Sequence, residues 1–99
     1  MKRNEENGYY QKVLVLLVKA MEDDIRIRIV IELLYNGPLS FRALGRRLRV
    51  NYKKLNEALK KLTVLKIVKI HIFNVSSSRS YKFYSLNEEI EELLKKLLL

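Results

Sequence analysis

The stretch from Ser40 to Thr63, SFRALGRRLRVNYKKLNEALKKLT, constrains the fold of this chain more than any other. It holds two amphipathic segments, and each follows a residue type that caps helices, Ser40 for the first and Asn51 for the second. Only Arg49 and Val50 separate the first helix from the second cap, so the two helices must cross steeply. The sequence therefore predicts a helix-turn-helix over residues 40–63.

Two alternating runs rich in β-branched and aromatic residues follow the helix pair. Ile67–Phe73 (IVKIHIF) and Tyr81–Ser85 (YKFYS) both have the composition and period of strands. The stretch between them, residues 74–80 (NVSSSRS), is mostly polar, and we expect it to form a flexible loop that carries Arg79. A hairpin over residues 67–85, directly after a helix-turn-helix, is the wing of a winged helix.

The same pattern supports a resemblance to a known family. DIRIRIVIELLYNGPLS, then LGRRLRVNYKKLNEALKKLTVLKIV, then a hairpin ending in RSYKFYSL resembles the ArsR-like family of winged-helix repressors, in particular small archaeal members, over Asp23 to Leu86. The resemblance implies a mostly α fold of five helices with a small β-hairpin, in which the first and last helices form a homodimer interface. Arg49 and Lys66 stand where glycine is common in that family, so both turns must accept a non-glycine backbone.

The segment Asp23–Tyr35 (DDIRIRIVIELLY) carries two conflicting signals. Its isoleucines alternate with polar residues as in a strand, but the aspartates offer a helix cap, and an Asn-Gly-Pro sequence follows as a helix stop. We expect a helix here, with Leu39 beginning a short strand beside the hairpin.

Two further helices are expected, Tyr9–Met21 and Asn87–Leu99, with residues 1–8 as a flexible polar tail and residues 9–99 as a single domain. The first helix has a continuous apolar run, Val13–Val18, that covers more than one face, and the second has one apolar stripe. A small chain has difficulty covering both, so we expect pairing with a second copy, while burial within the chain's own core stays open. The dimer-interface candidates are Val13, Leu14, Leu17, Leu94, Leu97 and Leu98.

The net charge of +9 is distributed unevenly along the chain. Between Leu39 and Ser85 there are 12 Lys or Arg residues and one acid, Glu57, whereas the rest of the chain has a net charge of −2. This concentration favours binding of a polyanion over an ordinary solvated surface. The candidates for phosphate contacts are Arg42, Arg46, Arg47, Arg49, Lys54, Lys61, Lys66 and Arg79.

The exposed side of the second helix, residues 52–63, holds side chains that can read base edges in a major groove. Asn can pair with adenine, Lys can donate to guanine, and Glu can accept from cytosine. The candidates for base reading are Tyr52, Lys53, Asn56, Glu57 and Lys60. For each of them an ordinary exposed helix position is the alternative, and Tyr52 could instead pack in the core.

The sequence offers little for enzymatic or metal chemistry, so we expect a protein that is not an enzyme. His71 is the only histidine, and there is no cysteine, which argues against metal sensing and fits a cytoplasmic location. No cofactor and no small-molecule ligand can be read from the residues. The longest apolar run is far shorter than the roughly 20 residues of a membrane-spanning helix, and no secretory signal is evident.

These features together predict a homodimeric, sequence-specific regulator of transcription that binds double-stranded DNA. The second helix would enter the major groove, with half-sites about 10 base pairs apart, and the wing at residues 74–80 would reach the minor groove or the backbone. Two alternatives stay open. A non-specific architectural DNA- or RNA-binding protein needs only the positive charge, and a winged-helix adaptor for protein partners would use an apolar surface.

Overall fold

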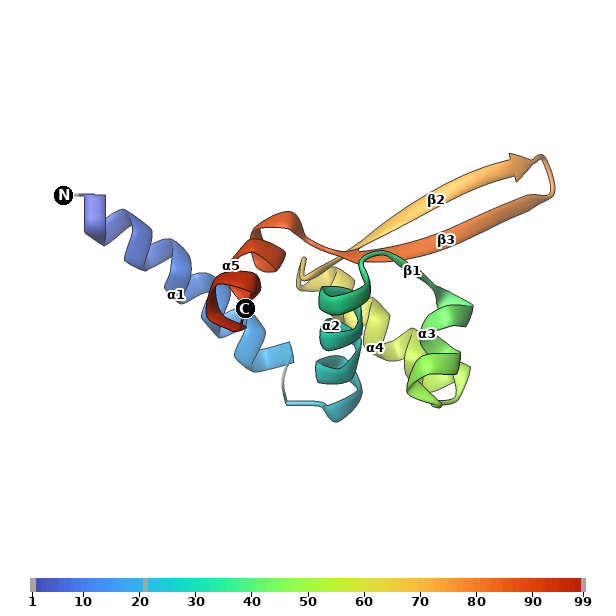
Figure 1. Cartoon of the computed structure of the whole chain (residues 1–99), viewed down its shortest axis with the longest axis horizontal. Coiled ribbons are helices and arrows are strands. Elements are labelled where there is room, and N and C mark those ends of the chain that lie inside the picture. The colour runs from blue at the N-terminus through green and yellow to red at the C-terminus, as the bar shows by residue number, and fades with distance from the viewer. Residues whose placement is uncertain (1, 21, 99) are drawn as a thin grey trace.

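The structure is a computed structural model that describes residues 2–20 and 22–98 (Figure 1). These residues form five helices and a three-stranded antiparallel sheet, which confirms the expected winged helix-turn-helix. The helices and strands are α1 (Lys2–Ala20), α2 (Asp24–Asn36), β1 (Leu39–Ser40), α3 (Phe41–Leu48), α4 (Tyr52–Val64), β2 (Val68–Ser76), β3 (Arg79–Leu86) and α5 (Glu88–Leu98).

Both helices of the helix-turn-helix begin at the expected caps. The Ser40 hydroxyl accepts a hydrogen bond from the Ala43 amide at 3.1 Å, and Asn51 Oδ1 accepts one from the Lys54 amide at 2.8 Å. Each cap satisfies a backbone donor that the first turn of a helix leaves free. The start of α3 and the start of α4 are therefore set by residues next to them in sequence.

The two turns that flank α4 have the backbone expected of glycine positions. Arg49 has φ 54° and Lys66 has φ 61°, so both are left-handed. The Arg49 amide donates to the Gly45 carbonyl at 2.9 Å, which closes the last turn of α3. A residue with a Cβ pays about 1–2 kcal/mol in this conformation. The expectation that these two turns accept a non-glycine backbone is confirmed.

The ambiguous segment is a helix, as expected. Asp23 Oδ1 accepts hydrogen bonds from the Ile25 amide at 2.9 Å and the Arg26 amide at 3.4 Å, and Gly37 ends the helix with φ 75°. The strand-like alternation of its isoleucines is overridden because α2 buries a stripe with helical spacing. That stripe is Ile29, Val30, Leu33 and Leu34.

The sheet has the order β1-β3-β2, with β3 in the centre. The expected short strand is present, and Leu39 pairs with Tyr84. On β2, the face that carries Val68 meets the core, and its partner Leu86 is buried with it. Figure 1 shows the hairpin projecting from the helical body past α3, at the end of the molecule opposite the start of α1.

The tip of the hairpin differs from the expected flexible loop over residues 74–80. The strands pair as far as Ser76 with Arg79, with a bulge between Asn74 and Ser76, and only Ser77 and Ser78 form the turn. The loop expectation was wrong because it rested on polarity. Both faces of the projecting tip are exposed, so polar side chains can continue a backbone ladder there.

The core lies between α2, α4, the base of the hairpin and α5. Its least exposed side chains come from the helix-turn-helix, α2 and the start of β2. Because one side of α4 is buried in this core, the opposite side of the helix faces solvent. The fully buried residues are Ile29, Leu33, Leu44, Leu55, Leu59, Leu62, Ile67 and Val68.

The first helix is longer than expected, since α1 begins at Lys2 and not at Tyr9. The stretch expected to be a tail lacks proline and β-branched residues, so its polar sequence does not prevent a helix. The described residues do not include Met1, Met21 and Leu99, which belonged to the expected tail and to the two expected end helices. Among residues 2–20 and 22–98, no helix has both the length and the hydropathy needed to span a bilayer.

The expected dimer-interface residues fall into two groups. Val13, Leu17 and Leu94 are buried within the chain itself, and side chains already buried add no free surface for a partner. The place of these three residues at a dimer interface stays a prediction, since α1 and α5 turn this side onto their own core. The remaining candidates are exposed, as are two neighbours on α1, and the exposed set is Leu14, Val15, Val18, Leu97 and Leu98.

Candidate nucleic-acid interface

The outward side of α4 carries two lysines. Leu55 and Leu62 point into the core, and the helical period of 3.6 residues places Lys53 and Lys60 on the opposite side. Both lysines are exposed, and they are separated by two turns of helix. A helix with such a side can lie in a major groove and present donors to base edges.

The other predicted base-reading residues face different neighbours. Asn56 lines a groove beside the wing, whereas Glu57 lines a small hollow with Asp23 and Arg26 at the start of α2, together with Lys54, a candidate for phosphate contact. All three side chains on α4 are exposed. The structure therefore brings Asn56 to the wing side of the outward face and turns Glu57 towards α2.

Tyr52 forms a contact between the two helices. Its ring lies 5.3 Å from the ring of Phe41, centroid to centroid, at an interplanar angle of 51°. It also covers Gly45, where a Cβ would lie only 2.8 Å from Tyr52 Cε1. Tyr52 is nevertheless 56% exposed, so its ring packs on Phe41 and Gly45 without entering the core, and its role in base reading stays a prediction.

A groove of about 940 Å³ runs between the start of α3, the side of α4 and strand β3. Four cationic side chains line it, Arg42, Arg46, Arg79 and Lys82, and its lining contains no acid. A concave surface of one sign of charge focuses the electric potential and attracts a polyanion. The aromatic and polar residues that share the groove are Phe41, Tyr81, Phe83, Tyr84, Ser40, Ser80 and Asn56.

Lys82 was missed by sequence reasoning. It lies in strand β3 between two aromatic residues, so it was read as part of the hairpin pattern and not as a contact. A signal was present, because the hairpin from Val68 to Leu86 has three cations and no acid. The other exposed cations that were predicted lie outside the groove, and these are Arg49, Lys54, Lys61 and Lys66.

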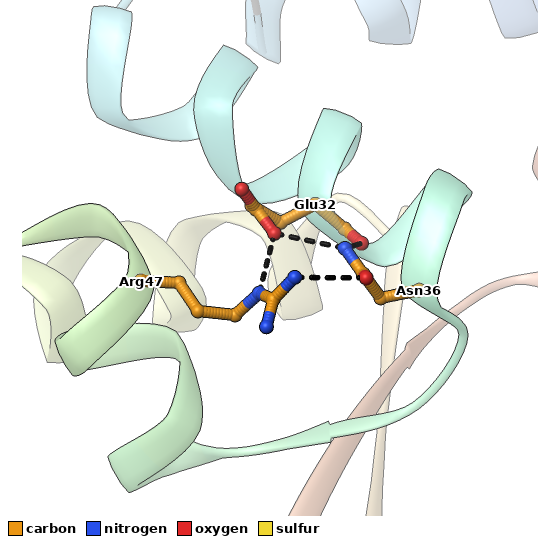
Figure 2. Close-up of polar contacts among 3 residues, drawn as sticks. All are labelled: Glu32, Asn36 and Arg47. Atoms are coloured by element: carbon orange, nitrogen blue, oxygen red, sulfur yellow. Dashed lines mark hydrogen bonds and ion pairs between the residues drawn. The ribbon is translucent and has the colours of Figure 1, made fainter.

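Arg47 does not face the groove, although it was predicted to contact phosphate. Figure 2 shows its guanidinium directed at α2, where Arg47 Nε lies 2.8 Å from Glu32 Oε2 and Nη2 donates to Asn36 Oδ1 at 2.9 Å. Asn36 Nδ2 donates in turn to Glu32 Oε2 at 2.9 Å. These partners hold the Arg47 side chain between α2 and α3, and its contact with phosphate stays a prediction.

Arg28 contacts the same end of α3 as Arg47 does. Its Nη2 donates to the Leu48 carbonyl at 2.6 Å, which satisfies an acceptor at the C-terminus of α3 and places positive charge there. Two arginines, Arg28 and Arg47, thus join α3 to α2 by hydrogen bonds.

His71 lies on the wing, and its Nε2 is 2.7 Å from Ser85 Oγ across the two strands. Within residues 2–20 and 22–98, no group of three or more His, Asp or Glu residues is placed to hold a metal ion. Burial raises the pKa of the Tyr84 phenol above its ordinary value. These observations describe structural roles, and the cationic groove with α4 stays the main candidate site.

A capped helix-turn-helix with a basic outward helix and a wing that encloses a cationic groove defines the class of winged-helix transcriptional regulators. The chain is similar to HlyU from Vibrio cholerae N16961, with 26% identity and a TM-score of 0.67, over 98% of this chain and 94% of that one. It is equally similar to the transcriptional regulator HlyU from Vibrio vulnificus CMCP6, with 26% identity and a TM-score of 0.70, over 98% and 95%.

The transcriptional repressor PagR of Bacillus anthracis shares the fold, with 23% identity and a TM-score of 0.70, over 92% of this chain and 98% of that one. No protein-family model and no curated protein sequence matches the chain. The similarity to solved structures extends over nearly the whole chain, so it includes α4, the wing and both end helices.

Proposed function

We propose that this chain is a sequence-specific regulator of transcription that binds double-stranded DNA, of the small ArsR-like winged-helix type. The observation that carries the proposal is the exposed lysine side of α4 next to a groove lined by four cations and no acid. The similarity to HlyU, at 26% identity, supports the broader class of DNA-binding transcription regulators. The proposal treats residues 9–99 as one domain that acts in the cytoplasm.

The outward side of α4 and the cationic groove would have different roles in binding DNA. The outward side of α4 would enter the major groove, where Lys53 and Lys60 can donate to guanine and Asn56 can pair with adenine. The backbone of one DNA strand would lie in the groove between α4 and the wing. There the cations supply affinity and fix the register, because phosphate contacts carry no sequence information themselves.

A second copy of the chain completes the proposal. Helices α1 and α5, which carry the exposed apolar residues, lie on the side of the molecule away from the hairpin tip (Figure 1), so pairing through them would leave the outward side of both copies of α4 free. A two-fold dimer would then bind two half-sites about 10 base pairs apart.

The first experiment measures duplex binding by fluorescence anisotropy across a salt series, with a selected duplex and a scrambled duplex of equal length. A preference of at least roughly a thousandfold, with a slope of about 6 or more released counterions, is expected of a specific regulator. Equal affinity for both duplexes would instead identify an architectural protein. No binding to either duplex at low salt would favour the adaptor.

Variants then test the assignment of α4. Asn56→Ala with Lys60→Ala should lower the preference for the selected duplex by about 10-fold or more, because a good base contact contributes about 1–3 kcal/mol of discrimination. Lys54→Ala is the control, since this lysine on the same helix lines the hollow beside α2. It should weaken both duplexes slightly and equally. Full discrimination in the double variant would contradict the assignment.

A further inference from the structure

The outer face of the wing carries four aromatic rings in adjacent positions. His71 pairs with Phe83 and Phe73 pairs with Tyr81 across the antiparallel strands β2 and β3. Directly paired residues point to the same face, and residues two apart on one strand share it too. The four rings, which we call the aromatic face, therefore form a continuous patch.

The rings of the aromatic face are held in place and accessible. Phe73 and Phe83 meet edge to face with centroids 5.6 Å apart, and the His71 ring is tied to Ser85 by its 2.7 Å contact. The Phe73 and Tyr81 residues are nevertheless 58% and 49% exposed. The patch is thus ordered by contacts within the hairpin but left open to solvent.

Folding does not account for the aromatic face. The opposite face of the same hairpin carries Val68, Tyr84 and Leu86, which are buried in the core. The aromatic face contributes nothing to that core, and the hairpin carries it away from the helical body (Figure 1). An ordered apolar patch on a projecting element is typical of a binding surface.

The charges around the aromatic face indicate which ligand fits it. The hairpin holds no acidic residue. Lys69 lies on the aromatic face two residues before His71, Arg79 lies at the tip, and Lys82 lies on the opposite face. Tyr81 and Phe83 also line the cationic groove, so the patch and the groove are continuous. A matching ligand has planar apolar groups joined by negative charges. Bases and phosphates of a nucleic-acid strand have this composition, but in a duplex the base faces are already stacked on each other.

We propose that the aromatic face of the wing is a second nucleic-acid site, which stacks the unpaired bases of a single strand while the cations of the hairpin hold its phosphates. This site lies on the hairpin and adjoins the groove of the duplex site, but its stacking does not depend on the outward side of α4. Single-stranded DNA and RNA share the chemistry that it recognises, since every base has a flat face.

The test measures binding of fluorescein-labelled dT12 and rU12, two strands without internal pairing, by anisotropy with the full chain. Phe73→Thr with Tyr81→Thr should weaken binding at least about 10-fold, because stacking contributes about 1–3 kcal/mol per base. Ile72→Thr is the matched control. It removes an apolar residue that is 59% exposed on the same strand but pairs with Lys82 on the opposite face.

A ring-conserving variant separates stacking from hairpin stability. Phe73→Tyr with Tyr81→Phe keeps both rings and should bind either strand within about 2-fold of the unchanged chain, because the stacking area is retained. Tighter binding of dT12 or of rU12 identifies DNA or RNA as the preferred strand, and binding of either one supports the proposal. Absence of binding to both strands, or equal losses in Ile72→Thr and the double threonine variant, would overturn the proposal.

The duplex experiment distinguishes this proposal from the proposed function. Phe73→Thr alone, which leaves the groove-lining Tyr81 in place, should weaken binding of dT12 and keep the preference for the selected duplex, whereas Asn56→Ala with Lys60→Ala should lose that preference and still bind dT12. If the wild-type chain bound dT12 but no duplex, the proposed function would fail and the aromatic face would stand. If it bound the duplex but neither dT12 nor rU12, the proposal for the aromatic face would fail and the proposed function would stand.

Discussion

At the scale of single residues, Gly45 decides how α3 and α4 meet. The absence of a side chain there gives the Tyr52 ring its place, because a Cβ would lie 2.8 Å from Tyr52 Cε1. Glycine inside a helix normally costs about 0.5–1 kcal/mol relative to alanine. The chain accepts that cost, and Tyr52 gains its contact with Phe41.

Replacement of Gly45 tests this contact. Gly45→Ala should lower the free energy of unfolding by about 1 kcal/mol, because the added methyl group displaces the ring of Tyr52. In a Tyr52→Ala background the same change should raise stability by about 0.5–1 kcal/mol, since only helix propensity remains. Urea denaturation of the four proteins measures both effects. An effect of the same sign in both backgrounds would contradict the packing role.

Tyr84 gives the protein a specific sensitivity to alkaline pH. Burial raises the pKa of its phenol above the ordinary value of about 10, so the unfolded chain releases this proton at a lower pH than the folded chain does. The protonated Tyr84 phenol therefore contributes fully to stability below about pH 10. This contribution is lost as the pH rises towards the pKa that the phenol has in the folded chain.

The expected result is that Tyr84→Phe loses less stability than the unchanged chain between about pH 9 and pH 11. Denaturation at a series of pH values measures this difference in slope. Tyr35→Phe removes an exposed tyrosine on α2 and serves as the control. Parallel slopes for Tyr84→Phe and the unchanged chain would show that burial of this phenol does not govern the effect.

At the scale of elements, the helix-turn-helix is fastened to α2 by side chains distant in sequence. Arg47 on α3 meets Glu32 and Asn36 on α2, and Arg28 on α2 reaches the end of α3 at Leu48. These contacts join α3 to α2 through side chains that do not line the groove beside the wing.

Neighbouring arginines on α3 should therefore behave differently. Arg47→Ala should lower stability by about 0.5–1 kcal/mol, as expected for a partly exposed ion pair, and should leave the salt dependence of duplex binding unchanged. Arg46→Ala, which removes a groove cation, should reduce the salt slope by about 1 with little effect on stability. A reduced salt slope of duplex binding in Arg47→Ala would instead show that Arg47 contacts phosphate.

At the scale of the whole molecule, different surfaces lie at different ends. The hairpin tip lies at one end of a molecule that measures 53 × 28 × 24 Å, and the start of α1 lies at the other (Figure 1). Helices α1 and α5, which carry exposed apolar residues, lie on the side of the molecule away from the hairpin tip (Figure 1). A dimer formed there would present two copies of α4 on one side of DNA.

A charge introduced on α1 tests that arrangement. Val18→Lys should dissociate the proposed dimer, because Val18 is 62% exposed in the single chain and would be buried against a second copy. Tyr35→Lys adds the same charge at a residue of equal exposure on α2 and should leave the dimer intact. Sedimentation velocity reports the mass of each. Equal behaviour of the two variants would place the interface elsewhere.

The sequence by itself determined the elements that depend on near neighbours. Ser40 and Asn51 cap α3 and α4 through amides only three residues away, and Arg49 and Lys66 take the left-handed backbone expected of their turns. The helical stripe of α2 could also be predicted, because periodicity is a property of the chain alone. The same reasoning identified α4 and its exposed lysines.

Only the tertiary structure decided what depends on distant partners. Arg47 turns to Glu32 because α3 crosses α2, and Lys82 enters the groove because β3 lies beside α3. The buried side of α1, with Val13 and Leu17, was set by the core that other elements form. Local patterns state which side chains can be exposed, but the packing of helices against each other determines what each side chain faces.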